Sequence, residues 1–129
     1  FLIEHCKKLL EKKVDRILIE GVGGWCVPID QHTLMLDFVR QLCSHIVLVV
    51  GLRLGCINHA ILSARAIESS GFHLVGWVAN HIDESLYAPE LVIKSIQHHI
   101  NCPLLAEIPF ISSKKQLDFT AIQQIDFLI

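Results

Sequence analysis

Residues 46–51, with the sequence IVLVVG, constrain the fold more than any other segment of the chain. The run is wholly apolar and rich in β-branched side chains, and polar and apolar residues do not alternate in it. This pattern is typical of a strand in a parallel sheet that is covered on both faces by helices. We therefore expect an α/β fold built around a buried strand at this position.

Two further kinds of segment surround this strand. Short apolar runs followed by glycine, asparagine or proline are typical of strands, and they occur at residues 16–19, 74–80 and 104–109. Apolar residues three and four positions apart are typical of amphipathic helices, and they occur at residues 2–14, 34–43, 59–70, 89–100 and 120–129. Strands that alternate with helices predict a mostly parallel sheet flanked by helices.

Several helix ends are marked by residues that suit them. Asn58 is placed to cap the helix at residues 59–70, Gly71 suits the end of that helix, and Pro89 takes the first position of the next one. No capping residue precedes the helix at residues 2–14. We therefore expect the chain to begin inside that helix.

The composition fits one cytoplasmic domain. The chain has 129 residues, of which 52% are apolar and 19% are charged, below the roughly 25% charged residues of typical soluble domains. Its charge-free apolar stretches, such as residues 41–52, are shorter than the roughly 18 residues that a membrane span needs. Five cysteines without a CxxC spacing are typical of reduced thiols in the cytoplasm.

The charge balance argues against two classes of partner. A formal net charge of −2 and a pI near 6.5 leave no excess of basic residues that could follow a phosphate backbone or an anionic lipid surface. We therefore expect neither a nucleic acid nor a membrane as a partner.

Ligands of open α/β sheets bind beyond the carboxyl ends of the strands, so the residues that follow each predicted strand are the candidate site. After the first strand, Glu20 is an acid of the kind that holds Mg²⁺, and the glycines of residues 21–24 allow backbone to approach a phosphate. An ordinary strand-to-loop turn explains the same residues. The GVGG string matches neither the GxGxxG nor the GxxxxGK[ST] pattern.

The second strand is followed by residues 51–58, GLRLGCIN, at the start of a helix. Backbone N–H groups at a helix start bind carboxylates or phosphates, and Arg53 adds positive charge. A tight strand-to-helix connection with an exposed arginine is the alternative. Cys56 and His59 are three residues apart, but a packed cysteine beside a surface histidine fits them better than a metal site does.

The last two strands end in residues that suit a nucleotide base. Asn80 has an amide that both donates and accepts hydrogen bonds, although asparagine at a strand end is also a common turn former. Residues 108–111, IPFI, offer apolar surface to a base, or form the edge of the core. The sequence holds neither an HExxH helix nor the residue order of a Ser/His/Asp hydrolase.

Four strings at these strand ends together resemble ATP-dependent dethiobiotin synthetase, a P-loop enzyme of biotin biosynthesis. They are residues 17–29, ILIEGVGGWCVPI; residues 46–67, IVLVVGLRLGCINHAILSARAI; residues 76–83, GWVANHID; and residues 104–111, LLAEIPFI. The resemblance implies a P-loop NTPase-like fold. It also implies that 7,8-diaminopelargonic acid, CO₂ and MgATP are converted to dethiobiotin, ADP and phosphate, through a carbamate that is phosphorylated and then closes the ureido ring.

The resemblance also implies roles for individual residues. Glu20 resembles the acid that coordinates Mg²⁺, and it joins the residues near ATP, which are Glu20, Gly21, Val22, Gly23, Asn80, His81, Pro109, Phe110, Ile111 and Gln116. The residues that resemble a segment reaching across a homodimer interface to the substrate carboxylate are Leu54, Gly55, Cys56, Ile57 and Asn58. Two residues depart from the family. At the position of His81 the family often has an acidic or other polar residue, and near Gln116 it often has a glutamate.

The chain departs from the family more strongly by an absence. Gly-Lys does not occur in it, so it has neither the Walker A loop nor the catalytic lysine that follows that loop. We therefore expect residues 1–129 to be the C-terminal portion of a single P-loop domain, without catalytic residues and inactive alone. The alternatives are a non-catalytic dethiobiotin synthetase-like module for dimerisation or ligand sensing, and a different P-loop amidotransferase or ligase.

Overall fold

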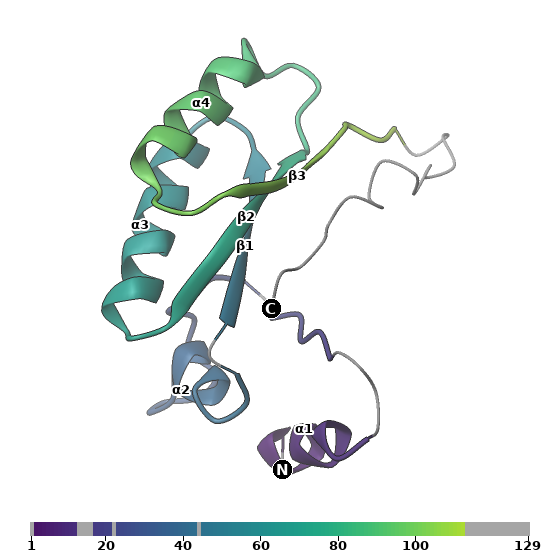
Figure 1. The fold of residues 1–129 in the computed structure, drawn as a ribbon, viewed down its shortest axis with the longest axis vertical. Helices are drawn as coiled ribbons and strands as arrows, with labels where there is room; N and C mark the ends of the chain where they lie inside the picture. The colour runs from purple at the N-terminus through teal and green to yellow at the C-terminus, as the bar shows by residue number, and fades with distance from the viewer. Residues whose placement is uncertain (1, 13–16, 22, 44, 113–129) are drawn as a thin grey trace.

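The computed structural model describes residues 2–12, 17–21, 23–43 and 45–112. Within them the chain forms a parallel sheet with the strand order β1-β2-β3 (Figure 1). The elements are α1 (Leu2–Leu10), α2 (Met35–Val39), β1 (His45–Leu52), α3 (Cys56–Ser69), β2 (His73–His81), α4 (Pro89–His99) and β3 (Leu104–Ile108). The α/β fold class with a parallel sheet and flanking helices is confirmed.

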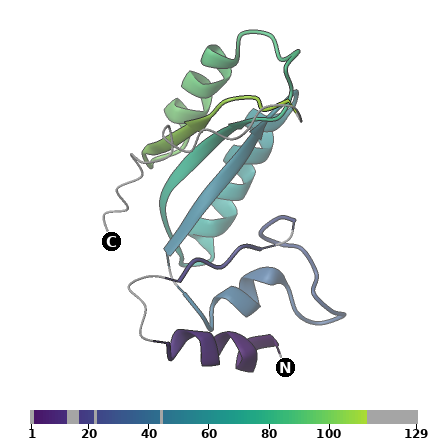
Figure 2. The ribbon, with the colours of Figure 1, turned by 90° about the vertical axis from the view of Figure 1, so that its right-hand side faces the viewer.

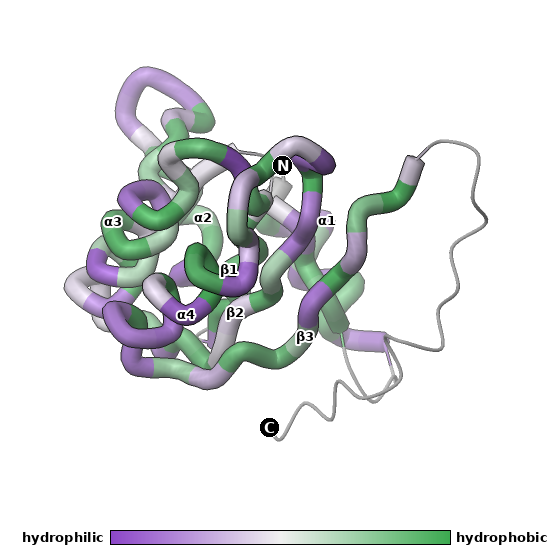
Figure 3. The backbone as a smooth tube through the Cα atoms, turned by 90° about the horizontal axis from the view of Figure 1, so that it is seen from above, coloured by the Kyte–Doolittle hydropathy of each residue, from purple (hydrophilic) through white to green (hydrophobic). Residues whose placement is uncertain are grey.

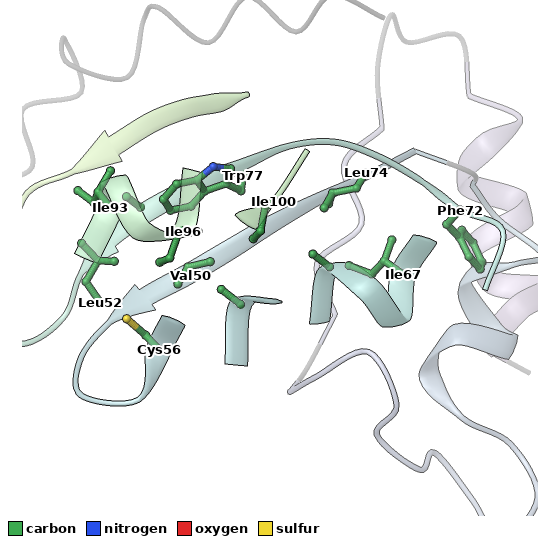
Figure 4. Close-up of a cluster of buried hydrophobic side chains, with 13 residues drawn as sticks. Val50, Leu52, Cys56, Ile67, Phe72, Leu74, Trp77, Ile93, Ile96 and Ile100 are labelled. Atoms are coloured by element: carbon green, nitrogen blue, oxygen red, sulfur yellow. The ribbon is translucent and has the colours of Figure 1, made fainter. Parts of the chain in front are cut away.

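One continuous core lies between the sheet and the helices α3 and α4, which cover the same face of it (Figures 1 and 2). The large side chains that are almost fully buried there are Trp77, Leu52, Ile67 and Ile96 (Figure 4). Burial of such a side chain stabilises a fold by about 1.5–3 kcal/mol. Among the described residues, the indole Nε1 of Trp77 has no hydrogen-bond partner.

The opposite face of the sheet is less covered. Val49 on β1 is 60% exposed, whereas its neighbour Val50, which points to the helices, is 6% exposed. The expectation that both faces of residues 46–51 are covered is therefore wrong for the described part of the chain. The reason is that both helices that pack on the sheet lie on one side of it.

The predicted strand at residues 16–19 is also wrong, since residues 17–20 pair with no described strand. An apolar run becomes a strand only where a neighbouring strand accepts its backbone hydrogen bonds. Arg16 and the predicted helix at residues 120–129 lie outside the described residues. The remaining predicted strands agree with β1, β2 and β3 to within a residue at each end.

The predicted helices agree less closely at their ends. α3 begins at Cys56, so Asn58 lies inside its first turn and the N-cap is Gly55. Gly55 has a φ of +88°, in the left-handed region that favours glycine. α2 has only five residues, about half of the predicted 34–43, and none of its residues is buried. No helix of the described residues is long and apolar enough to cross a lipid bilayer.

The N-terminal part of the chain packs at the end of the sheet where β2 begins (Figure 2). The Trp25 ring meets Phe72 edge to face, with centroids 4.7 Å apart, and its Nε1 donates to Ser70 Oγ at 3.3 Å. Arg40 donates to the Ser70 carbonyl at 2.9 Å, and its guanidinium lies 5.0 Å from the centre of the Phe72 ring. These contacts fasten the region before β1 to the sheet.

Candidate functional site

Three strand ends meet in one row at the carboxyl edge of the sheet. Gly51 pairs with Asn80, and Asn80 pairs with Ile108 on the far side. In the next row, Leu52 pairs with His81. The register thus brings together residues that are far apart in the sequence, because parallel strands all end at the same edge.

An open pocket lies at this edge. A hollow of about 300 Å³ is lined by Asn80, His81, Ile82, Pro109, Phe110 and Ile111. It adjoins a hollow of about 350 Å³ that shares three of these residues and adds Glu107. Volumes in this range suit a small ligand. Five of the residues that resemble ATP contacts therefore lie together: Asn80 and His81 at the end of β2, and Pro109, Phe110 and Ile111 after β3.

The segment after β3 supplies the apolar wall of the pocket. It leaves the sheet on the side away from α3 and contains a hydrophobic stretch, coloured green (Figure 3). Phe110 is 39% exposed, so one of its surfaces is open to a ligand. Apolar walls with few polar groups are typical of sites that bind flat aromatic ligands.

Glu107 is a pocket residue that the sequence did not reveal. Its Oε1 lies 2.7 Å from His81 Nε2, which is a strong hydrogen bond and an ion pair when the imidazole is protonated. The His81 side chain is 17% exposed and Glu107 is 52% exposed. The only hint in the sequence was a single acid in the otherwise apolar residues 104–108. Recognising its partner requires the register of β2 against β3.

Gly51 shapes the same region. A Cβ atom at this position would stand 2.6 Å from Cδ1 of Ile82, well inside contact distance. Ile82 lines the pocket, so a side chain at position 51 would displace part of its wall. Glycine at the end of β1 therefore lets the chain after β2 close over the sheet edge.

The loop after β2 carries a fixed negative charge. The Ser85 hydroxyl donates to Asp83 Oδ1 at 2.7 Å, and the Ser85 backbone N–H donates to the same atom at 2.9 Å. These two hydrogen bonds, the hydroxyl first, hold the pKa of the Asp83 carboxyl below its ordinary value. Asp83 therefore stays ionised at neutral pH.

The start of α3 offers fewer free donors than predicted. The Cys56 backbone N–H donates to the Arg53 carbonyl at 3.0 Å. It is therefore not free to bind a ligand, contrary to the expectation for this helix start. Ile57 and Asn58 are the second and third residues of the helix, whose N–H groups have no acceptor within it. Leu54 is 93% exposed beside them. Cys56 is buried, and the described residues contain no cluster of three metal-ligating side chains.

The structure does not bring Glu20 to the pocket. Glu20, Gly21 and Gly23 are exposed, and the chain that follows them packs through Trp25 at the start of β2. The pocket lies at the other end of this nine-residue strand, roughly 26 Å away at about 3.3 Å per residue. Val22 and Gln116 lie outside the described residues.

Comparison with known proteins identifies the chain's relatives. A family model described as an AAA domain matches residues 2–116. The chain is 40% identical over 106 residues to the ATP-dependent dethiobiotin synthetase BioD of Baumannia cicadellinicola, which covers 82% of this chain and 47% of that protein. It is 39% identical over 127 residues to the BioD of Wigglesworthia glossinidia brevipalpis, covering 98% of this chain and 55% of that protein.

The BioD of Nitrosospira multiformis is 37% identical over 116 residues, covering 90% of this chain and 51% of that protein. The chain thus spans about half the length of the curated relatives it matches. The family match nevertheless covers most of the chain, and its strands form the parallel sheet that such a fold requires. The chain therefore belongs to the AAA domain family, and the resemblance to dethiobiotin synthetases that its sequence indicated is confirmed.

Proposed function

We propose that the protein acts in biotin biosynthesis as an ATP- and Mg²⁺-dependent dethiobiotin synthetase, and that this chain holds the base of the nucleotide. The observation that carries the proposal is the pocket at the carboxyl edge of the sheet, which joins the ends of β2 and β3. Three relatives named ATP-dependent dethiobiotin synthetase are 37–40% identical to this chain over the aligned residues, which supports the proposal.

The pocket offers the two kinds of contact that a nucleotide base needs. Phe110 and Pro109 provide apolar surface for a flat ring, while the Asn80 amide and the His81 imidazole provide hydrogen bonds to its edge. Ile82 and Ile111 complete the wall. We assign the base of ATP to this pocket, and the phosphates to its open side.

The start of α3 is the proposed site for the substrate carboxylate. The N–H groups of Ile57 and Asn58 and the positive end of the helix favour an anion. The neighbouring Leu54 is almost fully exposed, and a homodimer partner that covers it would bring the carboxylate site of one chain to the other chain's nucleotide. In this proposal the ligands are 7,8-diaminopelargonic acid and CO₂, and the enzyme is cytoplasmic.

Glu20 is the proposed Mg²⁺ ligand. A carboxylate has the hard oxygen donors that Mg²⁺ prefers, and Mg²⁺ commonly keeps only one or two protein carboxylates beside water and phosphate oxygens. One exposed acid such as Glu20 therefore fits this ion chemically, and to serve ATP bound in the pocket its segment would have to approach the carboxyl edge of the sheet from the place that it takes in this structure. When bound to ATP, Mg²⁺ would neutralise charge on the transferred phosphoryl group.

The test is growth without biotin. The open reading frame that contains this chain is expressed in a bacterium that lacks dethiobiotin synthetase, with added dethiobiotin as the positive control. We expect growth from the natural sequence and loss of growth from Glu20→Gln. The matched control is Glu84→Gln, the same change at an exposed acid that does not line the pocket.

Two results would contradict parts of the proposal. Growth of the Glu20→Gln strain at the normal rate would remove Glu20 from the metal site. Failure of the natural sequence to support growth, with the protein present and folded, would favour a non-catalytic module for dimerisation or ligand sensing. Binding of diaminopelargonate without turnover, measured by titration calorimetry, would identify such a module directly.

A further inference from the structure

The hydrogen bond between His81 and Glu107 determines which nitrogen of the imidazole carries the proton. An ionised carboxylate only accepts hydrogen bonds, so Nε2, which lies 2.7 Å from Glu107 Oε1, is the donor. In a neutral imidazole the other nitrogen, Nδ1, is then an acceptor. In the described part of the chain Nδ1 has no hydrogen-bond partner.

The two residues are placed so that one acts through the other. Glu107 lies on β3 opposite Ala79, two residues before His81 ends β2. Its carboxylate is half exposed, whereas the imidazole is largely covered and lines both hollows of the pocket. The carboxylate thus stands at the rim and holds a ring that forms the wall.

Asn80 by itself does not give the pocket a fixed polarity. Its amide presents a donor and an acceptor, and rotation of the amide by half a turn exchanges them. It therefore suits a purine with an amino group at position 6 and one with a carbonyl oxygen there. A neighbouring group of fixed polarity is needed to tell the two apart.

We propose that Glu107 is a positioning residue that fixes His81 in the Nε2–H tautomer, so that Nδ1 accepts a hydrogen bond from the 6-amino group of a purine. The pocket then selects 6-aminopurines over 6-oxopurines, because an oxygen at position 6 would face the lone pair of His81 Nδ1 and could not donate a hydrogen bond to it. This inference rests on the proposed function and names the ligand specificity of the same pocket.

The test compares adenosine with inosine, which differ at position 6 and in the protonation of the adjacent N1. Both nucleosides are titrated into the 129-residue chain labelled with ¹⁵N-histidine, and NMR measures binding and the tautomer of His81, assigned with His81→Asn. The natural chain should prefer adenosine roughly 2- to 12-fold, the range of one net hydrogen bond. Glu107→Gln should bring the ratio close to one, because a glutamine amide can donate to Nε2 as well as accept from it.

The control variant is Glu84→Gln, which removes an acid from the loop after β2 and should keep both the preference and the tautomer. An Nδ1–H tautomer in the natural chain overturns the proposal without any variant, and so does an unchanged adenosine preference in folded Glu107→Gln. Failure of the natural chain to bind adenosine overturns the base assignment itself and this inference with it. Adenosine binding without a preference over inosine overturns only the inference.

Discussion

The two parts of the chain on either side of residue 44 contain similar fractions of apolar residues but bury them very differently. Residues 45–112 form a sheet with two helices and a continuous core in which four large side chains are almost fully buried. Residues 2–43, as far as they are described, form two short helices, and Leu9, Leu10, Ile17 and Leu18 are exposed there. Local pattern sets the helices, but burial requires a partner surface of matching shape.

The largest expected difference between the two parts is in their response to truncation of an apolar side chain. Ile96→Ala on α4 should lower the free energy of unfolding by about 2–5 kcal/mol, because it leaves a cavity in a close-packed core. Leu10→Ala on α1, where the leucine is 41% exposed, should change it by about 0.5 kcal/mol or less. Urea unfolding followed by circular dichroism measures both changes. Equal losses of stability in the two variants would contradict the difference in burial between the two parts.

The attachment between the two parts depends on Trp25. Trp25→Ala removes an edge-to-face aromatic pair and an indole hydrogen bond, together about 1–3 kcal/mol. Hydrogen exchange should speed up for residues 23–43 and stay slow in β2. Trp25→Phe keeps an aromatic ring against Phe72 and should cost only about 1 kcal/mol. Faster exchange throughout the sheet would show that the attachment stabilises the whole molecule.

Cysteine reactivity should distinguish the two parts as well. Burial, with a smaller effect of the Glu68 carboxylate, raises the pKa of the Cys102 thiol to about 11, from an ordinary value of 9.0. At pH 8 this lowers the thiolate fraction nearly 100-fold, and the higher nucleophilicity of the remaining thiolate offsets part of the loss. Cys102 should therefore react with iodoacetamide roughly tenfold more slowly in the folded than in the unfolded chain.

Mass spectrometry of the alkylated peptides gives these rates, with the exposed Cys26 as internal reference for the reagent. The sign for stability follows from the same pKa. The folded state favours the neutral thiol, so its stabilising contribution is complete below about pH 9 and declines as the pH rises towards 11. Equal alkylation of Cys102 in the folded and unfolded chain at pH 8 would contradict this assignment.

The smallest expected effect tests whether the well-packed part is free of strain. Ala88, the N-cap of α4, has a φ of +49°, which alanine rarely adopts. Ala88→Gly should raise the free energy of unfolding by about 0.5–1 kcal/mol, because glycine adopts this conformation without steric cost. Ala66→Gly inside α3 should lower it by about 1 kcal/mol. Thermal unfolding of both variants checks this reversal of sign.

The sequence predicted those elements whose partners are also close in the chain. The apolar run at residues 46–51 corresponds to β1 because β2 and α3 follow it directly and supply its neighbours. The similar run at residues 16–19 does not form the predicted strand in the described structure. A strand needs a neighbouring strand to accept its backbone hydrogen bonds, and a local sequence pattern does not say whether one is present. The first turn of α3 was misplaced because a positive φ at Gly55, and not a polar side chain, begins the helix.

The residues of the candidate site differ in the same way. Asn80, His81 and residues 109–111 could be predicted because strand ends meet at one edge of a parallel sheet. Glu107 could not, since its pairing with His81 depends on how β2 and β3 are aligned. Glu20 stays a prediction, because it does not line the pocket and the chain after it packs through Trp25 at the other end of β2.

The two tryptophans offer separate optical signals for the two parts of the chain. The indole of Trp77 is fully buried among aliphatic side chains, so its emission should lie at shorter wavelength and resist quenching by iodide. Trp25 is partly exposed and hydrogen-bonded, so its emission should lie at longer wavelength and be quenched. A single urea titration followed by tryptophan fluorescence can therefore report detachment of the N-terminal part and unfolding of the sheet as two separate changes in emission.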